Sequence, residues 1–360
     1  KDQSMKALVG LILAASLEAV GAWGAEGHMI IAEIAKHVST SRTNSLLEHL
    51  LASNAVTLPM YKDLFASAVW PDQLRNDGFT ATTAWHYINL PFCPNSSYCP
   101  TCPDAEQVVW ALGQANSTMV FQPGHVYEQG FMIRFVLHLV GDIHQPLHCA
   151  TWYDAMFPNG DQGGNLIQVK FDGQPTNLHT FWDEVGGLFP DSTPLPVSKP
   201  VRADVVKQAK MIMQSHPKSN FTLTPNFTAW AEESFQLAVT DVYLNGQLPI
   251  GGALTPEYVN KSRAISKRRL AEAGYRLGYL LDHYSSNMVS AHVPSGTCST
   301  EDKALMIGVT AAGTVVITLV AMAIVQHLVS RCRAGGSPKP LATQGSLGDF
   351  SRLDESRRGL

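Results

Sequence analysis

One segment of the chain, residues 135–148, places potential metal ligands within an otherwise apolar run, FVLHLVGDIHQPLH. If the run is helical, His138 and Asp142 leave the same face one turn apart, and Pro146 ends the helix before His148. Burying these groups without a cation would cost free energy, and the donor types suit Zn²⁺. For the His–Asp pair taken alone, an ordinary ion pair on a helix surface is the alternative. Residues elsewhere in the sequence distinguish the metal-site hypothesis from the ion-pair hypothesis.

Helix-like apolar spacing dominates the remaining sequence, and 45% hydrophobic residues exclude a disordered chain. The spacing predicts helices over residues 30–51, 106–119, 129–147, 203–214, 229–243 and 261–289. Residues 166–171 are the clearest strand candidate. Because residues 23–295 contain neither a repeat nor a low-complexity break, we expect a single all-α domain with a minor β-hairpin.

Both ends of the chain have the composition of targeting segments. Residues 1–22 predict a signal peptide. After a stalk at residues 296–303, residues 304–329 predict one C-terminal transmembrane helix, a buried core helix being the alternative. Basic residues follow directly, so the positive-inside rule predicts a cytoplasmic tail over residues 330–360. We therefore expect a type I single-pass protein of the plasma membrane with its catalytic domain outside the cell.

An extracellular location also predicts N-glycans and disulfides, without fixing which cysteines pair. The sequons are at Asn95, Asn116, Asn220, Asn226 and Asn260. The extracellular cysteines would be Cys93, Cys99, Cys102, Cys149 and Cys298. The net charge is −4 although the predicted tail is basic, so the main domain is acidic and no basic patch for nucleic acid is expected. Phosphate affinity should then come from bound cations, and no protein partner is implied.

Further candidate ligands recur outside the first segment. His179 and Asp183 again lie four residues apart, among aromatic residues. If cleavage follows Ala22, Trp23 becomes the mature N-terminus, and its free amine could bind a metal beside His28. The remaining candidates are Asp72, with Arg75 one turn further on, and His86.

In this order the candidates match a known pattern. The chain resembles the single-strand-specific zinc nucleases and 3′-nucleotidases of fungi and plants, and especially the membrane-bound 3′-nucleotidase/nucleases of protozoan parasites. Mature members of that family begin with Trp and continue with His, Asp, His, HxxxD, His and a final HxxxD. The matching residues are Trp23, His28, Asp72, His86, His138, Asp142, His148, His179 and Asp183.

The resemblance implies a mainly helical, phospholipase C/nuclease-like fold that holds three Zn²⁺ in a cleft. The three ligand sets would be Asp72, His86, His138 and Asp142; Trp23, His28 and Asp142; and His148, His179 and Asp183. Two zinc ions sharing Asp142 would activate a water for attack on phosphorus, and the third would stabilise the departing 3′-oxygen.

The resemblance also implies roles for residues beside the ligands. Arg75 would stabilise charge on the phosphoryl oxygens, with a salt bridge to Asp77 or another carboxylate as its alternative. Asn165, after the Gly163-Gly164 turn, would orient phosphate or serve only the turn.

Base recognition is expected beside His86. Tyr87 occupies the family's base-stacking position. Fungal members have an Asp two residues later, whereas this chain has Asn89, whose amide both donates and accepts, so base preference stays open. His144 matches no ligand position, and we expect it behind the ligands or on the phosphate side.

The sequence therefore predicts a zinc-dependent endonuclease and 3′-nucleotidase. It would cleave the P–O3′ bond of single-stranded RNA, DNA and 3′-nucleotides, for nucleotide salvage outside the cell. A zinc-dependent phospholipase C is one alternative, but the last ligand in that family is Glu rather than an Asp such as Asp183. A non-catalytic surface metal-binding protein is the other, and the complete ligand set together with Arg75 argues against it.

Overall fold

A computed structural model describes residues 23–94, 99–100, 107–121, 124–189 and 193–290. The predicted signal peptide, stalk, transmembrane helix and tail lie outside the described residues, as does the predicted domain boundary at residue 295.

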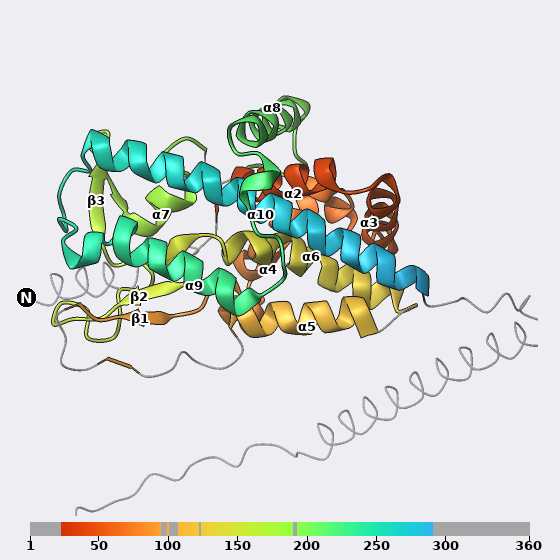
Figure 1. Cartoon of the computed structure of the whole chain (residues 1–360), viewed down its shortest axis with the longest axis horizontal. Helices are drawn as coiled ribbons and strands as arrows, with labels where there is room; N and C mark the ends of the chain where they lie inside the picture. Colours follow the sequence, from red (N-terminus) through yellow and green to blue (C-terminus); the bar gives the residue numbers. More distant parts are fainter. Residues whose placement is uncertain (1–22, 95–98, 101–106, 122–123, 190–192, 291–360) are drawn as a thin grey trace, which may run out of the picture. The chain divides into compact units, whose positions relative to one another are not determined.

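Three helices form the centre of the described structure. Helix α10 (Pro256–Ser290) packs along α2 (Ala25–Val38), and both contact α6 (Val126–Asp142) (Figure 1). The approach of α10 to α2 depends on Gly274, where a Cβ would lie 2.5 Å from Cγ2 of Ile34. Every residue of α6 from Ile133 to Asp142 is buried, so its polar side chains there must find partners inside the core.

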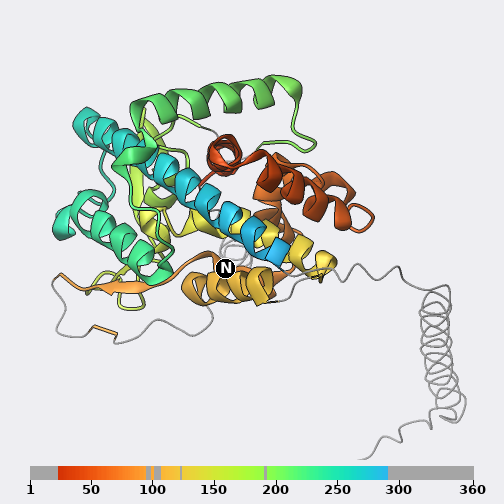
Figure 2. The same ribbon diagram turned by 45° about the vertical axis from the view of Figure 1, so that its right-hand side comes forward.

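The other helices surround this centre. Helices α3 (Ser41–Ser53), α4 (Leu64–Asn76) and α5 (Val108–Phe121) pack against α6. Helix α8 (Lys199–Ser215), at the top of both ribbon views, covers α2 and α10 (Figure 2). The remaining helices are α7 (Leu178–Asp183) and α9 (Phe227–Leu237). The short helical turns are η1 (Pro59–Tyr61), η2 (Thr80–His86), η3 (Pro146–His148), η4 (Lys218–Asn220), η5 (Ala238–Val242, a π-helical turn) and η6 (Leu244–Gly246).

The mainly helical fold agrees with the sequence, but several helix boundaries differ. The predicted helix over residues 30–51 is two helices, because the Thr40 side chain accepts a hydrogen bond from Thr43 N and starts α3. Helix α4 was not predicted, since it contains Pro71. Asp63 caps its first turn by accepting from Phe65 N and Ala66 N. This N-terminal cap favours α4 even though Pro71 lies inside the helix.

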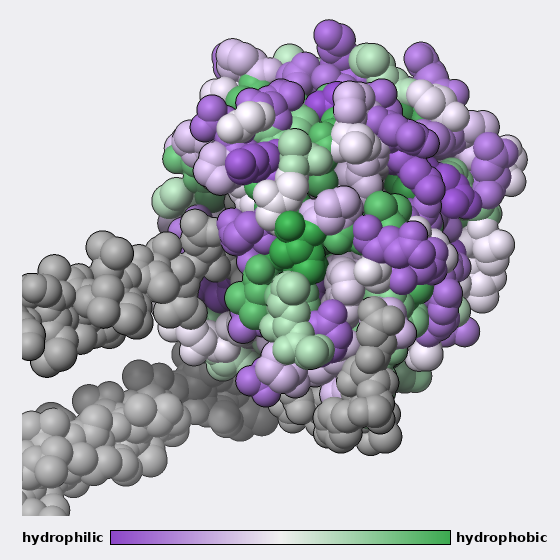
Figure 3. Space-filling model, turned by 90° about the vertical axis from the view of Figure 1, so that its left-hand side faces the viewer, coloured by the Kyte–Doolittle hydropathy of each residue, from purple (hydrophilic) through white to green (hydrophobic). Residues whose placement is uncertain are grey.

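Two small sheets lie at one end of the fold. Strands β3 (Gln168–Phe171) and β4 (Gln174–Asn177) are antiparallel, and their two-residue turn, Asp172-Gly173, has positive φ at both positions. This confirms the minor β-hairpin. Strands β1 (Leu90–Phe92) and β2 (Ala150–Trp152) form an unpredicted parallel pair, which brings the chain after His86 beside the chain after His148. The surface at this end is largely hydrophilic, with apolar residues gathered in a small central area (Figure 3).

The structure resolves part of the cysteine chemistry. Cys93 and Cys99 form a disulfide, as expected for an oxidising compartment. Cys149 is a buried free thiol 3.5 Å from the Ile143 carbonyl oxygen, and burial raises its pKa to about 12. It is therefore an unreactive core residue at neutral pH. Among the predicted sequons, Asn220, Asn226 and Asn260 are exposed.

The predicted plasma-membrane location is corrected by the structure. Within the described ranges, no helix is both long enough and apolar enough to cross a bilayer. Helix α10 has the length, 35 residues, but it carries charged side chains such as Lys261, Arg263 and Glu272. The predicted span, residues 304–329, lies outside the described residues. The predicted type I, cell-surface topology is accordingly not retained. Of the predicted fold class, the mainly helical domain is retained and the transmembrane helix is not.

Candidate metal centre

The side chains predicted to bind metal come from separate elements that meet beside α6. His138 and Asp142 lie four residues apart near the end of α6, and both are fully buried. Helix α2 contributes His28, α4 contributes Asp72, and η2 ends with His86. Since α2, α4 and η2 all pack against α6, ligands more than a hundred residues apart in the chain become neighbours.

A first cluster joins Asp72, His86 and His138. Oδ1 of Asp72 lies 3.5 Å from both Nδ1 of His86 and Nε2 of His138, and these two nitrogens are 3.1 Å apart. Three potential ligand atoms therefore surround one small space.

A second cluster joins His28, His138 and Asp142, and the Asp142 carboxylate links it to the first. Its Oδ1 lies 3.3 Å from Nε2 of His28. Its Oδ2 lies 3.0 Å from Nδ1 of His86 and 3.4 Å from Nε2 of His138. Oδ1 thus faces His28, whereas Oδ2 faces His86 and His138, and two oxygens directed at different imidazoles are the arrangement a bridging carboxylate needs.

A third cluster joins His148 on η3 with His179 and Asp183 on α7. Nε2 of His148 and Nε2 of His179 are 3.1 Å apart, and the latter lies 3.2 Å from Oδ2 of Asp183. All three side chains are buried. The second HxxxD pair therefore forms its own site with the histidine that follows the first.

Backbone carbonyls fix three of the imidazoles. Nδ1 of His138, His148 and His179 lies 2.7 Å from the carbonyl oxygens of Ala68, His86 and Gly163, respectively. A carbonyl oxygen only accepts, so Nδ1 carries the proton and Nε2 presents its lone pair to the cluster. This orientation is typical of metal-binding histidines.

Unsatisfied polar atoms test whether a cation fits here. Buried atoms without a hydrogen-bond partner include both ring nitrogens of His28, Oδ1 of Asp72, Oδ1 of Asp142, Nε2 of His86 and Nη2 of Arg75. Leaving one such group unpaired in the core costs about 1–3 kcal/mol. Imidazole nitrogens and carboxylate oxygens, without thiolate, are the donors of catalytic zinc sites. The three clusters therefore fit three Zn²⁺ ions.

The pKa values of three side chains show where the first two clusters favour a positive charge and where they oppose it. Burial lowers the pKa of His28 well below its ordinary value, and nearby His138 adds to this effect. Burial also opposes the charge on His138, but the carboxylates of Asp142 and Asp72 outweigh it and raise its pKa to about 9. Burial opposes the charge on Asp72 as well, yet His138, His86 and Arg75 bring its pKa well below the usual range.

The segment before α2 enters the site with Trp23, which is fully buried. The Gly24 amide donates to the carbonyl oxygen of Asp183 at 2.9 Å, so this segment is joined to the third cluster. A Cβ at Gly27 would lie 2.7 Å from Cβ of Trp23, which explains the glycine there. The ligand role of the Trp23 amine remains a prediction.

Arg75 lies beside the first cluster, where sequence reasoning expected it. It is 9% exposed, and its Nη2 is 3.4 Å from Oδ1 of Asp72. The alternative partner Asp77 instead accepts from Nε2 of Gln73. The guanidinium is therefore held beside a predicted ligand rather than on the surface.

The predicted substrate-binding residues have different surroundings. Tyr87 is partly exposed and directly follows His86. The Asn89 side chain accepts from the Thr151 hydroxyl at 2.8 Å, so its oxygen is already engaged. The Asn165 amide donates to the Gln162 carbonyl oxygen at 2.9 Å and thus closes its own turn, which favours the structural alternative for this residue.

Two buried residues near the ligands were not predicted from the sequence. Gln145 lies between predicted ligands in the first segment and contacts Asp183, although no spacing rule identifies an amide. Burial raises the pKa of Asp161 to about 6, even though Trp152 N, Gly163 N and the Tyr243 hydroxyl donate to it. Asp161 thereby holds the loop whose Gly163 carbonyl orients a histidine of the third cluster.

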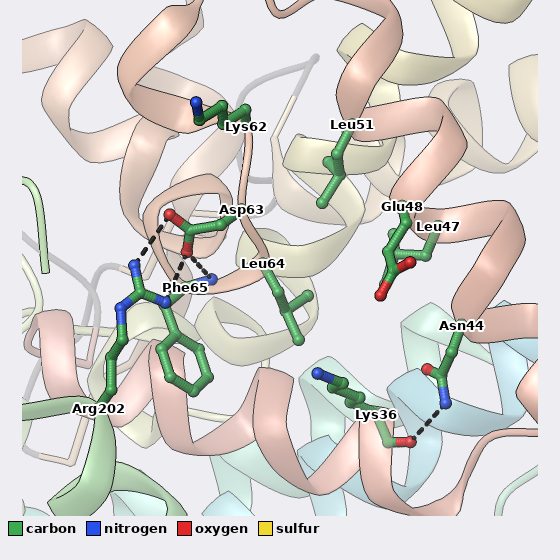
Figure 4. A pocket seen from close by; sticks show the side chains of 10 residues that line it. All are labelled: Lys36, Asn44, Leu47, Glu48, Leu51, Lys62, Asp63, Leu64, Phe65 and Arg202. Carbon is green, nitrogen blue, oxygen red and sulfur yellow. Dashed lines mark hydrogen bonds and ion pairs between the residues drawn. The ribbon is translucent and has the colours of Figure 1, made fainter. Parts of the chain in front are cut away.

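A surface pocket of about 260 Å³ lies elsewhere, between α2, α3, α4 and α8 (Figure 4). Arg202 donates to both carboxylate oxygens of Asp63, at 3.1 and 3.0 Å, and lies over the Phe65 ring. Leu47 and Leu51 supply part of its apolar wall. It contains none of the candidate ligands, so it is separate from the metal centre.

Comparison with known proteins shows that the chain is similar to nucleases. The family model described as S1/P1 Nuclease matches residues 23–286. Nuclease S1 of Aspergillus oryzae is 29% identical over 282 residues, covering 73% of this chain and 92% of that protein. Endonuclease 4 of Arabidopsis thaliana is 28% identical over 299 residues, covering 77% and 94%. Nuclease P1 of Penicillium citrinum is 26% identical over 280 residues, covering 71% and 95%.

Proposed function

Because the chain belongs to the S1/P1 nuclease family, and is thus a metal-dependent hydrolase of the endonuclease class, we propose that it cleaves the P–O3′ bond of single-stranded nucleic acids and of 3′-nucleotides. Breaking this bond leaves a 5′-phosphate on each fragment of a polymer. From a 3′-nucleotide it releases a nucleoside and phosphate, products that suit nucleotide salvage.

The observation that carries the proposal is the position of Asp142 between two clusters. Its Oδ1 faces His28 and its Oδ2 faces His86 and His138, so one carboxylate is placed to hold two ions at a short separation. Two ions held in this way are typical of phosphoester hydrolases, in which bound zinc acts as a Lewis acid and lowers the pKa of water. A site that only stored metal would not require this bridging geometry.

The remaining ligands and Arg75 complete the proposed site. His148, His179 and Asp183 would hold the third ion, close to the departing 3′-oxygen. Arg75, held by Asp72, is placed to donate to phosphoryl oxygens on which negative charge grows in the transition state. In this proposal, catalysis depends on side chains that are buried and held in place before the substrate binds.

Selection of single strands is assigned to Tyr87. It is partly exposed and directly follows the ligand His86, so a base stacked on its ring would place the attached phosphate near the first cluster. A paired duplex does not present the face of a base in this way. Since the oxygen of Asn89 is already bonded to Thr151, only its NH₂ group is proposed to contact the base.

We assign the second ion a ligand from Trp23 as well. Trp23 is buried where the Gly24 amide meets Asp183, and removal of residues 1–22 would give it a free amine in that position. Sequencing the N-terminus of the active protein tests whether Trp23 carries the free amine that this assignment requires. Full activity and full zinc content in protein that still carries residues before Trp23 would contradict the assignment.

The proposed function is tested by giving the purified protein four substrates: 3′-AMP, 5′-AMP, single-stranded RNA and phosphatidylcholine. We expect turnover of 3′-AMP and RNA, loss of both activities with a chelator, and recovery with added zinc. Turnover of the lipid alone would identify a phospholipase C instead. Absence of any turnover by zinc-loaded protein would indicate a metal-binding protein without catalysis.

A further inference from the structure

The turn between the first HxxxD pair and His148 is buried and contains no predicted ligand. Residues Ile143, His144 and Gln145 connect the end of α6 to η3, and all three are fully buried. Each must therefore satisfy its polar groups within the protein. The partners of Gln145 lead directly to the third cluster.

The Gln145 amide has one possible orientation. Its Oε1 lies 2.5 Å from the backbone nitrogen of Leu147, and its Nε2 lies 2.5 Å from Oδ1 of Asp183. A backbone N–H only donates, so the amide oxygen must face Leu147. The NH₂ group then necessarily faces the Asp183 carboxylate, and a flipped amide would place two acceptors in contact.

The two carboxylate oxygens of Asp183 have different partners. Oδ1 accepts from Gln145, while Oδ2 lies 3.2 Å from Nε2 of His179. That nitrogen is in turn 3.1 Å from Nε2 of His148. Oδ2 of Asp183 therefore faces His179, while Oδ1 accepts a hydrogen bond from the Gln145 amide.

We propose that Gln145 is a positioning residue of the third zinc site, which holds the Asp183 carboxylate through Oδ1 so that Oδ2 is oriented toward the ion. The inference rests on the proposed role of Asp183 as a ligand. Coordination by one carboxylate oxygen and two imidazoles leaves the ion an open position for a substrate or product oxygen. A carboxylate free to rotate would no longer be oriented toward the ion before the ion binds, so the ion would bind less tightly.

Helices α9 and α10 keep the turn from moving. The Ser234 hydroxyl donates to the Ile143 carbonyl oxygen at 2.5 Å, and Nε of Arg269 donates to the His144 carbonyl oxygen at 3.1 Å. Nη1 of Arg276 donates to Nε2 of His144 at 2.9 Å, and Nδ1 of His144 donates to the Val140 carbonyl oxygen. The backbone directly before Gln145 is thus fixed before any ion binds.

Acidic residues in turn hold the two arginines. Nη1 of Arg269 lies 2.7 Å from Oε2 of Glu272, and Nη1 of Arg276 lies 2.6 Å from Oε2 of Glu233. Both guanidiniums are 2% exposed, so these charges are paired within the protein. His144 therefore braces the turn from behind and is not a ligand, which agrees with one of the two positions expected for it.

The test is zinc binding by the full chain with Gln145→Met, which keeps the side-chain length but removes the donor. Titration of metal-free protein with zinc should show a 10- to 100-fold weaker affinity at one site and unchanged affinity at the other two. After dialysis, elemental analysis should find one zinc fewer per chain than in the wild type. Circular dichroism confirms that the variant is folded.

Gln129→Met is the matched control, because Gln129 is also buried on this part of the chain but its Nε2 has no hydrogen-bond partner. It should bind zinc as the wild type does. If Gln145→Met does not fold, Gln145→Asn tests the same contact, since its amide is too short to reach both partners. Wild-type affinity at all sites in a folded Gln145 variant would overturn the inference, whereas a wild-type protein that binds zinc without cleaving phosphoesters would overturn the proposed function only.

Discussion

Replacing Asp142 by asparagine should weaken two of the three zinc sites at once. The carboxylate oxygens lie 3.3 Å from Nε2 of His28 on one side and 3.0 Å from Nδ1 of His86 on the other. Asparagine keeps the shape of the side chain but removes its negative charge, and its NH₂ group cannot serve as a ligand. Both ions that we propose to share the carboxylate would therefore lose a charged ligand.

The size of the effect follows from the distances and the burial. At about 4 Å and an effective dielectric constant of about 20, two unit charges interact by roughly 4 kcal/mol. Since about 1.4 kcal/mol corresponds to a factor of ten, each site should lose about three orders of magnitude in affinity. Asp142 is fully buried, so solvent does not screen this loss.

The assay is zinc content after dialysis against a weak chelator, with Asp183→Asn as the matched control. The control removes the same charge from a buried predicted ligand that belongs to the third cluster. We expect Asp142→Asn to retain one zinc per chain and Asp183→Asn to retain two. Equal losses in the two variants would refute the bridging role of Asp142, because a carboxylate serving one ion would behave like Asp183.

Three further results are expected. Tyr87→Ala should raise KM for single-stranded RNA about 5- to 150-fold with little change in kcat, whereas Tyr87→Phe should keep the wild-type KM; a fall in kcat alone would contradict a stacking role. The pKa of Asp161 is raised from 3.8 to about 6 in the folded state, so its contribution to the free energy of unfolding is complete below pH 3.8 and declines, by about 3 kcal/mol, as pH rises through 6. Urea unfolding should therefore show that the free energy of unfolding of the wild type falls relative to that of Asp161→Asn between pH 4.5 and pH 7. The same difference between the two proteins at both pH values would contradict the raised pKa. Gly274→Ala should destabilise by about 1–3 kcal/mol, because its Cβ would lie 2.5 Å from Ile34, while Gly113→Ala, with no atom near its Cβ, should stabilise by up to about 1 kcal/mol in thermal unfolding.

Part of the candidate site was predictable from the sequence because four of its candidate ligands occur at helical spacing, whereas the remaining candidates were identified by the resemblance to the family. His138 and Asp142, and again His179 and Asp183, are four residues apart, and this periodicity survives whatever the tertiary packing does. The structure adds which imidazoles the two carboxylate oxygens of Asp142 face, and sequence spacing cannot predict this. Gln145 illustrates the limit, because its role depends on a contact with a residue 38 positions away.

The fold was predictable in class but not in its boundaries. Helix α4 was missed because Pro71 outweighs a helical pattern in sequence reasoning, although the Asp63 cap favours the helix. The parallel pairing of β1 with β2 could not be foreseen, since it depends on how His86 and His148 are brought together by the core. Local signals thus defined most helices, and long-range packing decided the rest.

Anomalous diffraction from crystals of the zinc-loaded protein, recorded at the zinc absorption edge, tests the proposed trinuclear centre. We expect three peaks, two of them on either side of the Asp142 carboxylate and the third among His148, His179 and Asp183. Fewer than three peaks, or an Asp142 carboxylate that contacts only one of them, would contradict the proposed centre.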